Sequence, residues 1–295
     1  RSLAELIRPP VLSETDIPYA DTGNPRHRLD LYLPRERNTE KLPVIVFVHG
    51  GAWMAGDKSG VSDVLRPFVL SGDYACVAIG YRLSDEARWP AQIHDCKAAI
   101  RWLRANADFY GLDAERIAVW GFSAGGHLAL MLGASQNNPG LEGDIGSHSG
   151  VSSRVSAVVN YFGVFDLLAL PQRPSAIAIP GRPSPEEMLI GGSLLQNTDK
   201  AWSASPAAYI SADDPPVLTV HGNRDQLVPY EQSVKLDVAL RKAGVPSYFI
   251  TVQGGGHGTF GALANERVSA FLYHYLRGKE VLISREPLQQ PQSGQ

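Results

Sequence analysis

The chain has little cysteine, and its two cysteines are not arranged as a structural framework. Among 295 residues only Cys76 and Cys96 occur, too few for a disulfide scaffold and without the paired spacing of a zinc site. Cys76 lies in a strand-like run and Cys96 in the helical pattern that follows, so a bridge between them is geometrically conceivable. We expect two buried free thiols instead.

A hydrophobic run long enough to cross a membrane is also missing. No apolar stretch approaches the roughly 20 residues that span a bilayer. Arg1 opens a polar, proline-bearing segment that is unlike a signal peptide, and no initiator Met is present. We therefore expect a soluble protein, either cytoplasmic or secreted after removal of a leader before Arg1. The sequence indicates neither which compartment applies nor the oligomeric state.

Clusters of positive charge are absent as well. The formal net charge of -3 is spread along the chain without basic blocks or aromatic and basic residues in alternation. The chain therefore lacks the usual signatures of nucleic-acid binding and of attachment to anionic membranes, and we expect neither function. Small, near-neutral molecules are the expected partners.

What the chain does contain is an alternation of strand-like and helix-like segments. Helical patterns at residues 92–106 and 230–243 lie between the later strands, which predicts parallel pairing with helices on both faces of the sheet. The early strands are joined by loops too short for helices, so we expect an antiparallel N-terminal edge. The apolar runs that predict strands are residues 29–33, 44–48, 75–81, 117–120, 155–161, 217–221 and 248–252.

The chain divides into one large domain with two flanking segments and an insertion. Residues 1–28 form an N-terminal segment, residues 29–278 the α/β domain, and residues 279–295 a C-terminal tail that we expect to be disordered from Arg285 onward. Residues 163–206 are rich in Pro, Gly and Ser, and only residues 185–190 look helical. A connection of that length is usually a binding loop or a lid, so we expect it to cover part of the functional site.

The segment Gly121-Phe122-Ser123-Ala124-Gly125 lies between a strand-like and a helix-like run. This is the G-x-S-x-G pattern of a nucleophile elbow in the context where that turn forms. A serine at so sharp a turn has a strained backbone, and neighbours two positions away must lack a Cβ. We predict that Ser123 is a nucleophile at the N-terminus of a helix, where a developing oxyanion is favoured.

A serine nucleophile needs a base, and the base needs an orienting carboxylate. His257 is the best base candidate because it lies in a glycine-rich loop after the last predicted strand. Asp225 follows the penultimate strand and is the predicted acid, since catalytic groups gather at strand C-termini. Asp166, after an earlier strand, is a weaker alternative, and Asp213 and Asp214 precede their strand and so lie at the wrong end of the sheet.

The segment His49-Gly50-Gly51-Ala52-Trp53 directly follows the strand of residues 44–48. Its backbone N–H groups are placed to converge on an oxyanion, and we predict a hole formed by the amides of Gly51, Ala52 and Ala124. His49 is expected to brace this loop rather than to transfer protons. An ordinary glycine loop is the alternative, but a glycine loop and an elbow rarely coincide at two strand ends by chance.

Metal and phosphate sites are not expected. His127 lies one helical turn after Ser123, yet no H-E-x-x-H spacing or cysteine cluster accompanies it, so we expect it to pack within the helix. The glycines around His257 lack the lysine and the strand-to-helix placement of a phosphate-binding loop. We expect no metal and no organic cofactor.

These residues resemble the α/β-hydrolase esterases that carry an HGGxW oxyanion loop. The similarity covers roughly residues 29–276, and its central segments are similar to the bifunctional feruloyl and acetylxylan esterases and to related acetyl esterases. HGGxW also occurs in kynurenine formamidases, whereas the wider hormone-sensitive-lipase-like group has HGGG. Ala52 stands where that group has its third glycine, which narrows the resemblance to the subfamilies with HGGxW. The matching segments are HGGAW, YRLSDEARWPAQIHDCKAAIRWLRANA, YGLDAERIAVWGFSAGGHLAL and HGNRDQLVP.

The resemblance implies a serine esterase for small acyl groups, with a small-molecule or polysaccharide-linked ester as its substrate. It implies the α/β-hydrolase fold, a mostly parallel, twisted, eight-stranded sheet with helices on both faces. It also assigns Ser123, Asp225 and His257 as triad and the three amides as oxyanion donors. Trp53, Phe122 and Phe260 are neighbours of these groups in the sequence, and lining an acyl pocket or packing in the core are equally compatible with that position.

Three other functions fit parts of the pattern. An aryl formamidase acting on N-formylkynurenine would use the same residues on an amide. A peptidase like the prolyl oligopeptidases shares the DxxVP loop, but this chain has no room for their propeller. A non-catalytic binding protein of the same fold usually loses a triad member, and this chain retains candidates for all three.

Overall fold

A single sheet of nine strands organises residues 10–170 and 181–290, the part of the chain that the computed structural model describes. Its strand order is β1-β2-β4-β3-β5-β6-β7-β8-β9. The β1–β2 and β2–β4 pairs are antiparallel and the other pairs are parallel, as the sequence predicted for the N-terminal edge. The strands are β1 (Val11–Pro18), β2 (Arg28–Pro34), β3 (Leu42–Val48), β4 (Ala75–Ile79), β5 (Leu112–Phe122), β6 (Ala157–Tyr161), β7 (Val217–Gly222), β8 (Ser247–Gln253) and β9 (Leu288–Gln289).

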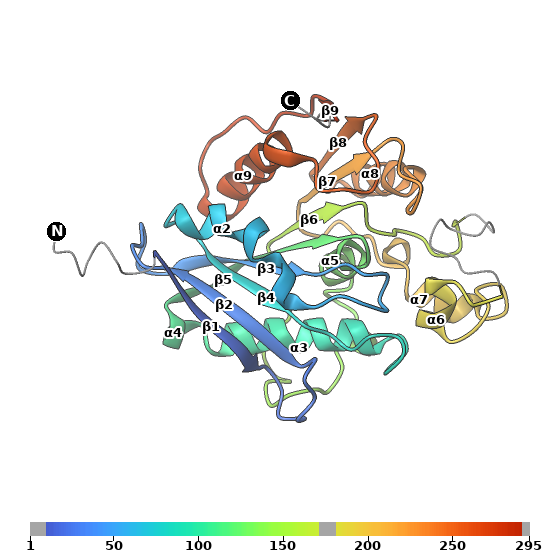
Figure 1. Ribbon diagram of the computed structural model, residues 1–295, viewed down its shortest axis with the longest axis horizontal. Coiled ribbons are helices and arrows are strands. Elements are labelled where there is room, and N and C mark those ends of the chain that lie inside the picture. Colours follow the sequence, from blue (N-terminus) through green and yellow to red (C-terminus); the bar gives the residue numbers. More distant parts are fainter. Residues whose placement is uncertain (1–9, 171–180, 291–295) are drawn as a thin grey trace.

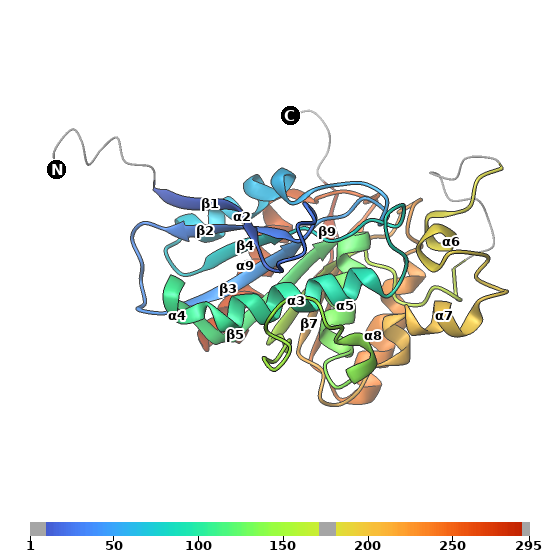
Figure 2. The same cartoon turned by 90° about the horizontal axis from the view of Figure 1, so that it is seen from below.

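Helices cover both faces of this sheet (Figures 1 and 2). Side chains of α3, α4, α5 and α8 share one hydrophobic cluster with one face, and side chains of α2 and α9 share a second cluster with the other. The longer helices are α2 (Ser62–Leu70), α3 (Ala91–Ala105), α5 (Ala124–Ala134), α8 (Glu231–Ala243) and α9 (Gly261–Arg277). The short ones are α4 (Ala107–Tyr110), α6 (Pro185–Ile190), α7 (Thr198–Ser203) and the 3₁₀ turns η1 (Lys58–Val61), η2 (Pro139–Leu141) and η3 (Pro206–Ala208).

Strand β3 shows why the central strands read as continuous apolar runs. All seven of its residues are buried, because both faces of a parallel sheet are covered by helices. Val46 belongs to the cluster on one face and its neighbours Ile45 and Phe47 to the cluster on the other. The alternation of side chains along a strand thus divides one apolar segment between two cores.

The expected number of strands was one too small. Strand β1 lies in the N-terminal segment and exposes six of its eight residues, so it lacks the apolar alternation that identifies a half-buried strand. Strand β9 lies in the tail that we expected to be disordered, where Leu288 is buried and the amide of Gln290 donates to the carbonyl of Gln253 at 3.0 Å. Residues 291–295 of that tail lie outside the described residues.

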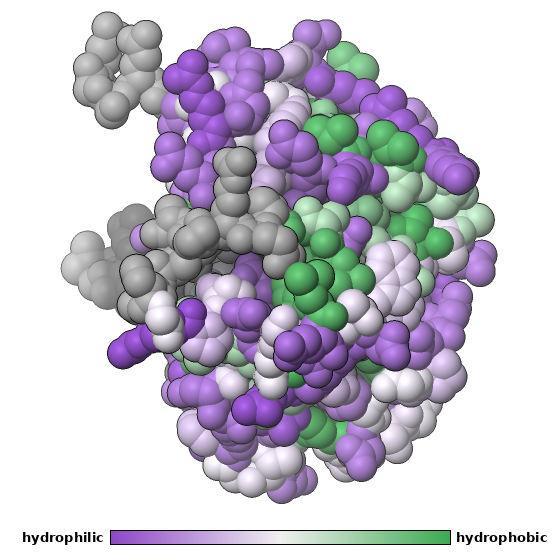
Figure 3. Space-filling model, turned by 90° about the vertical axis from the view of Figure 1, so that its right-hand side faces the viewer, coloured by the Kyte–Doolittle hydropathy of each residue, from purple (hydrophilic) through white to green (hydrophobic). Residues whose placement is uncertain are grey.

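The insertion at residues 163–206 is more ordered than its composition suggested. Besides α6, which matches the predicted helix, it forms α7 and η3. Segments as short as α7 and η3 display no helical periodicity, and the sequence analysis did not predict them. Residues 171–180 lie outside the described residues. Figure 3 views the molecule from the side that carries α6 and α7, where hydrophobic residues form patches among hydrophilic ones.

Cys76 and Cys96 are both buried free thiols, as predicted. Burial raises the pKa of each thiol above its ordinary value, which keeps both protonated near neutral pH. Across the described ranges, no helix combines the length and hydrophobicity required to cross a bilayer. The domain boundaries at residues 28/29 and 278/279 stay predictions.

Candidate active site

Ser123 occupies the turn between β5 and α5. Its φ of 55° and ψ of −118° are strained for a residue with a side chain. A Cβ on Gly121 would lie 2.0 Å from the carbonyl oxygen of Gly125, and a Cβ on Gly125 would lie 2.0 Å from that of Val48. Only glycine fits these two positions, so the turn that the sequence pattern predicted is imposed by direct backbone contact.

The loop after β3 reaches the same end of the sheet with three consecutive residues of positive φ. Gly51, Ala52 and Trp53 have φ values of 115°, 54° and 58°. Within the described chain, the N–H groups of Gly51 and Ala52 donate to no other group, and neither does that of Ala124, the first residue of α5. These three amides remain available to a ligand, and the one at the helix N-terminus carries partial positive charge.

His49, the first residue after β3, is held in place by Tyr81. Its ring stacks on Tyr81 with centroids 4.3 Å apart, and the Tyr81 hydroxyl donates to the His49 carbonyl at 2.9 Å. Burial lowers the pKa of His49 and so favours its neutral form. These contacts fit the bracing role expected from the sequence.

Trp53, at the end of the same loop, is held in place by His127. The indole N–H donates to His127 Nδ1 at 3.1 Å, and His127 Nε2 lies 2.6 Å from the carbonyl oxygen of Ala204. With an acceptor on one side and a donor on the other, the neutral ring carries its proton on Nε2. His127 is fully buried in α5, as expected, but its contacts also join the β3 loop to the end of the insertion.

Asp225 and His257 meet at the ends of β7 and β8. His257 Nδ1 lies 2.7 Å from Asp225 Oδ2, while Asp225 Oδ1 accepts from the amides of Leu227 and Val228 at 2.8 and 2.9 Å. Burial alone would raise the pKa of Asp225, but hydrogen bonds from His221 and His257 hold it far below its ordinary value. Asp225 is therefore an anion that orients His257 through its Nδ1–H.

His221 is a partner of Asp225 that the sequence analysis missed. Its Nε2 lies 3.2 Å from Asp225 Oδ2 and 3.1 Å from the Val228 carbonyl, and its Nδ1 lies 2.7 Å from Ser233 Oγ. The fully buried ring thus donates to the carboxylate and accepts from the serine hydroxyl. The available signal was the four-residue spacing from His221 to Asp225 in HGNRD, across the end of a buried strand.

The alternative carboxylates are engaged elsewhere. Asp166 Oδ1 accepts from the amides of Leu168 and Ala169 at 2.9 and 3.2 Å. Asp214 accepts from the hydroxyl and the amide of Ser211, in the turn before β7. Of the acids considered, the structure brings Asp225 to His257.

A cavity of about 490 Å³ opens over these groups. Ser123 and His257 both line it, although no hydrogen bond joins their side chains in the described structure. Its lining residues are Gly50, Gly51, Ala52, Trp53, Phe122, Ser123, Ala124, Phe162, Val164, Pro185, Glu186, Leu227, Val228, His257, Gly258 and Thr259. Catalytic hydrogen bonds in free enzymes are often long and tighten when substrate binds.

Of the three predicted pocket aromatics, Trp53 and Phe122 line this cavity and Phe260 does not. Phe260 is buried against Tyr161 and Phe162, where it packs in the core. The sequence analysis missed Phe162, whose ring lies 4.2 Å from that of His257. Phe162 has a φ of 44°, an unusual value for a bulky residue, which a sequence does not reveal.

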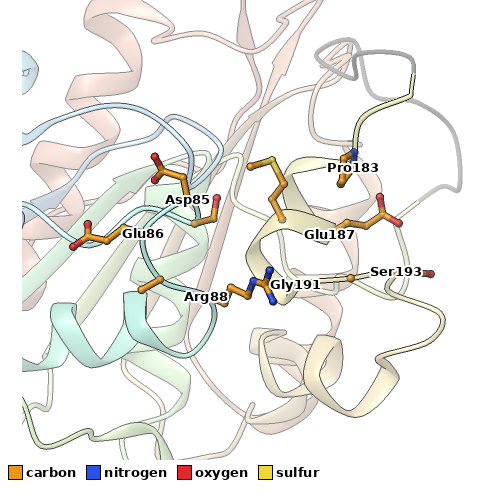
Figure 4. Close-up of a pocket in the computed structure, with 11 residues that line it drawn as sticks. Asp85, Glu86, Arg88, Pro183, Glu187, Gly191 and Ser193 are labelled. Atoms are coloured by element: carbon orange, nitrogen blue, oxygen red, sulfur yellow. The ribbon is translucent and has the colours of Figure 1, made fainter.

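The insertion forms one wall of the cavity through Val164, Pro185 and Glu186. On the other side of α6 lies a second, more open cavity of about 780 Å³ between α6 and the loop after β4 (Figure 4). Glu187 and Arg88 line this second cavity, so consecutive residues of α6 face two different spaces. Among the described residues, no group of three or more His, Cys, Asp or Glu is arranged to hold a metal ion.

Comparison with protein families relates this architecture to esterases. The model of the family described as BD-FAE matches residues 29–240. Esterase LipC of Mycobacterium tuberculosis (strain ATCC 25618 / H37Rv) is 32% identical over 238 residues, 80% of this chain and 57% of LipC. The probable carboxylic ester hydrolase LipM of the same strain is 34% identical over 219 residues, 74% of this chain and 49% of LipM. The chain therefore spans about half the length of these curated relatives.

Solved structures extend the similarity to about nine tenths of the chain. A truncated carbohydrate esterase from gut microbiota superimposes with a TM-score of 0.81 at 33% identity, covering 90% of this chain and 96% of that one. The bifunctional GH43-CE of Bacteroides eggerthii gives a TM-score of 0.82 at 38% identity, covering 89% of this chain and 38% of that one. The predicted α/β-hydrolase fold and the predicted similarity to HGGxW esterases are confirmed.

Proposed function

Because this chain belongs to the BD-FAE family of α/β-hydrolases, we propose that it is a serine carboxylesterase that hydrolyses short-chain acyl esters through an acyl-enzyme. The observation that carries the proposal is the shared cavity. It brings a strained serine, an aspartate-bound imidazole and three unpaired amides to one edge of the sheet. These are the parts that acyl transfer requires.

In the proposed first step, Ser123 Oγ attacks the ester carbonyl while His257 Nε2 accepts the hydroxyl proton. Asp225 stabilises the resulting imidazolium and holds its tautomer through the 2.7 Å contact with Nδ1. The amides of Gly51, Ala52 and Ala124 donate to the oxyanion, and each such donor contributes about 2.7–4 kcal/mol to barrier lowering in comparable enzymes. The protonated His257 then gives its proton to the departing alcohol.

The second step hydrolyses the acyl-enzyme. Water takes the place of the alcohol, His257 accepts its proton, and the acid leaves as Ser123 recovers its hydrogen. Asp225 is already anionic, and His221 and two backbone amides hold it in place, so no group other than His257 needs to change charge during the cycle.

We further propose acetyl or feruloyl esters of plant polysaccharide as substrates. The similarity to a carbohydrate esterase and to a bifunctional GH43-CE supports this substrate class. The volume of about 490 Å³ accommodates a small acyl group together with part of its alcohol.

The test uses Ser123→Ala, with Ser269→Ala on the exposed surface of α9 as control. We expect p-nitrophenyl acetate turnover to fall by about 10⁶ in the first variant and to stay at the wild-type level in the second. A fluorophosphonate probe should label the wild type and the control but not Ser123→Ala. Esterase activity that survives in Ser123→Ala, or a wild type that the probe does not label, would contradict the assignment.

A further inference from the structure

Two ionisable side chains line the catalytic cavity, and within the described residues only one of them is paired with an oppositely charged group. His257 is paired with Asp225. Glu186, the other, forms no ion pair with any residue in the described ranges. The remaining lining groups are apolar side chains, backbone and the hydroxyls of Ser123 and Thr259.

Glu186 is held in this position by local geometry. It is the second residue of α6, whose start is fixed by Ser184 as N-cap and by Pro185 in the first turn. Burial raises the pKa of Glu186, although hydrogen bonds from its own amide and from Ser184 favour the charged form. A buried carboxylate is destabilising unless enough hydrogen-bond donors reach it. Because Glu186 lines the cavity, hydroxyl groups of a bound substrate can add donors to the two that α6 itself provides.

We propose that Glu186 is a specificity-determining residue that binds hydroxyl groups on the sugar part of the proposed substrate. The inference rests on the proposed esterase function and extends it from the reacting bond to the leaving group. A carboxylate has two oxygens that accept hydrogen bonds from neighbouring hydroxyls, and such charge-assisted bonds are about twice as strong as neutral ones. A hydroxyl also both donates and accepts, so it pairs with either protonation state of Glu186.

A cationic alcohol such as choline is the competing partner for a lone carboxylate. Its quaternary ammonium is usually bound by several free aromatic faces. Here Phe122 stacks on Tyr161 with centroids 4.8 Å apart, Phe162 lies 4.2 Å from His257, and Trp53 packs edge-to-face against His127 at 5.1 Å. Since these rings already have partners, the cavity does not offer an aromatic cage, and hydroxyl groups fit it better.

The neighbouring Glu187 provides a matched control. It is the next residue of the same helix, yet it lines the second cavity and not the catalytic one, and Figure 4 labels it among the residues around that second cavity. Its carboxylate accepts from the Ser184 amide at 2.9 Å and completes the capping box of α6. Glu187→Gln keeps a side chain able to make that bond, so it removes one negative charge from α6 without changing the catalytic cavity.

The experiment compares wild type, Glu186→Leu, Glu186→Gln and Glu187→Gln on an acetylated xylo-oligosaccharide, p-nitrophenyl acetate and acetylthiocholine. The readout is the ratio of kcat/KM for the sugar ester to kcat/KM for p-nitrophenyl acetate. We expect Glu186→Leu to lower this ratio by about tenfold or more, mainly through KM. Glu186→Gln, which retains one acceptor oxygen, should lower it by less, and Glu187→Gln should leave it unchanged.

An unchanged ratio in Glu186→Leu, or an equal change in Glu187→Gln, overturns the proposal, and so does a loss confined to acetylthiocholine. Failure of the esterase function is recognised separately, as a wild type that hydrolyses none of the three esters. In that event, calorimetric titration with unesterified xylobiose decides the role of Glu186. Binding to wild type that weakens in both Glu186 variants supports it, and no binding to wild type overturns it.

Discussion

The floor and the insertion wall of the cavity are built in different ways. The floor consists of the β3 loop, the Ser123 elbow and the Asp225–His257 pair, where backbone contacts leave no room for a Cβ at Gly121 or Gly125. The wall is α6, a helix of six residues fixed chiefly by its capping box. Under the proposed function, the groups that act on developing charge are therefore held by the sheet, whereas a short capped helix meets the part of the substrate that varies.

His127 joins the floor to the C-terminal end of the insertion that carries α6. Its ring connects Trp53 of the floor to the carbonyl of Ala204 at the end of the insertion. The four predictions below test whether the floor governs chemistry and stability while the wall governs substrate preference.

The largest effect is expected from Asp225→Asn. The amide cannot hold the His257 tautomer or stabilise the imidazolium, so kcat should fall by about 10⁴, equivalent to about 5 kcal/mol. Steady-state kinetics with p-nitrophenyl acetate measure this loss. Asp166→Asn is the control, because among the described residues the Asp166 carboxylate accepts hydrogen bonds from two amides of its own loop and none from His257. A greater loss in Asp166→Asn than in Asp225→Asn would reverse the choice of acid.

Gly125→Ala should destabilise the floor as a whole. The added Cβ lies 2.0 Å from the Val48 carbonyl oxygen, and neither backbone segment is free to move. We expect a loss of about 3 kcal/mol or more in the free energy of unfolding, measured by urea denaturation. Gly150→Ala, where nothing lies within 4 Å of the new atom, should change stability by less than about 0.5 kcal/mol. Similar losses at both positions would mean that the elbow is not sterically constrained.

Acid should weaken the junction at His127. Burial lowers the pKa of His127 to about 4, whereas an unfolded histidine titrates near about 6.5. Between these values the unfolded chain binds the proton, so stability falls as pH decreases from 6.5 toward 4, by up to about 3 kcal/mol. His127→Asn removes this contribution. Unfolding free energies at pH 7 and pH 4.5 should therefore differ less in the variant than in wild type, and an equal difference would contradict the prediction.

The smallest loss of stability and activity is expected from a substitution in the N-terminal cap of α6. Ser184→Ala removes the hydroxyl that accepts from the Glu187 amide at 3.2 Å, and loss of such a cap costs about 1 kcal/mol. We expect Tm to fall by about 2–4 °C and KM for a sugar ester to change more than kcat. Differential scanning calorimetry and kinetics provide the two values. A loss of kcat comparable to that of Asp225→Asn would mean that the wall takes part in the chemistry.

Much of the site was predictable because its parts follow the ends of buried parallel strands. Ser123, Asp225 and His257 each come after an apolar run, and strands of a parallel sheet end at one edge. His221 was missed because it lies within a strand, where the sequence shows only a buried residue. Glu186 was missed because a helix of six residues, although predicted at residues 185–190, is too short for a periodic pattern to tell which of its residues line the cavity.

Local sequence patterns were enough to predict the mixed sheet, the strained serine turn and the carboxylate that contacts His257. Each of these features follows from residues close together in the sequence: the periodicity of a strand, a glycine at a crowded position, or a loop that directly follows a strand. The packing of the folded chain, by contrast, places Phe260 in the core and Phe162 beside His257, and makes Glu186 line the catalytic cavity and Glu187 the second one. The physical reason is that the orientation of a side chain across a cavity is set by segments distant in sequence, whose contacts no local pattern records.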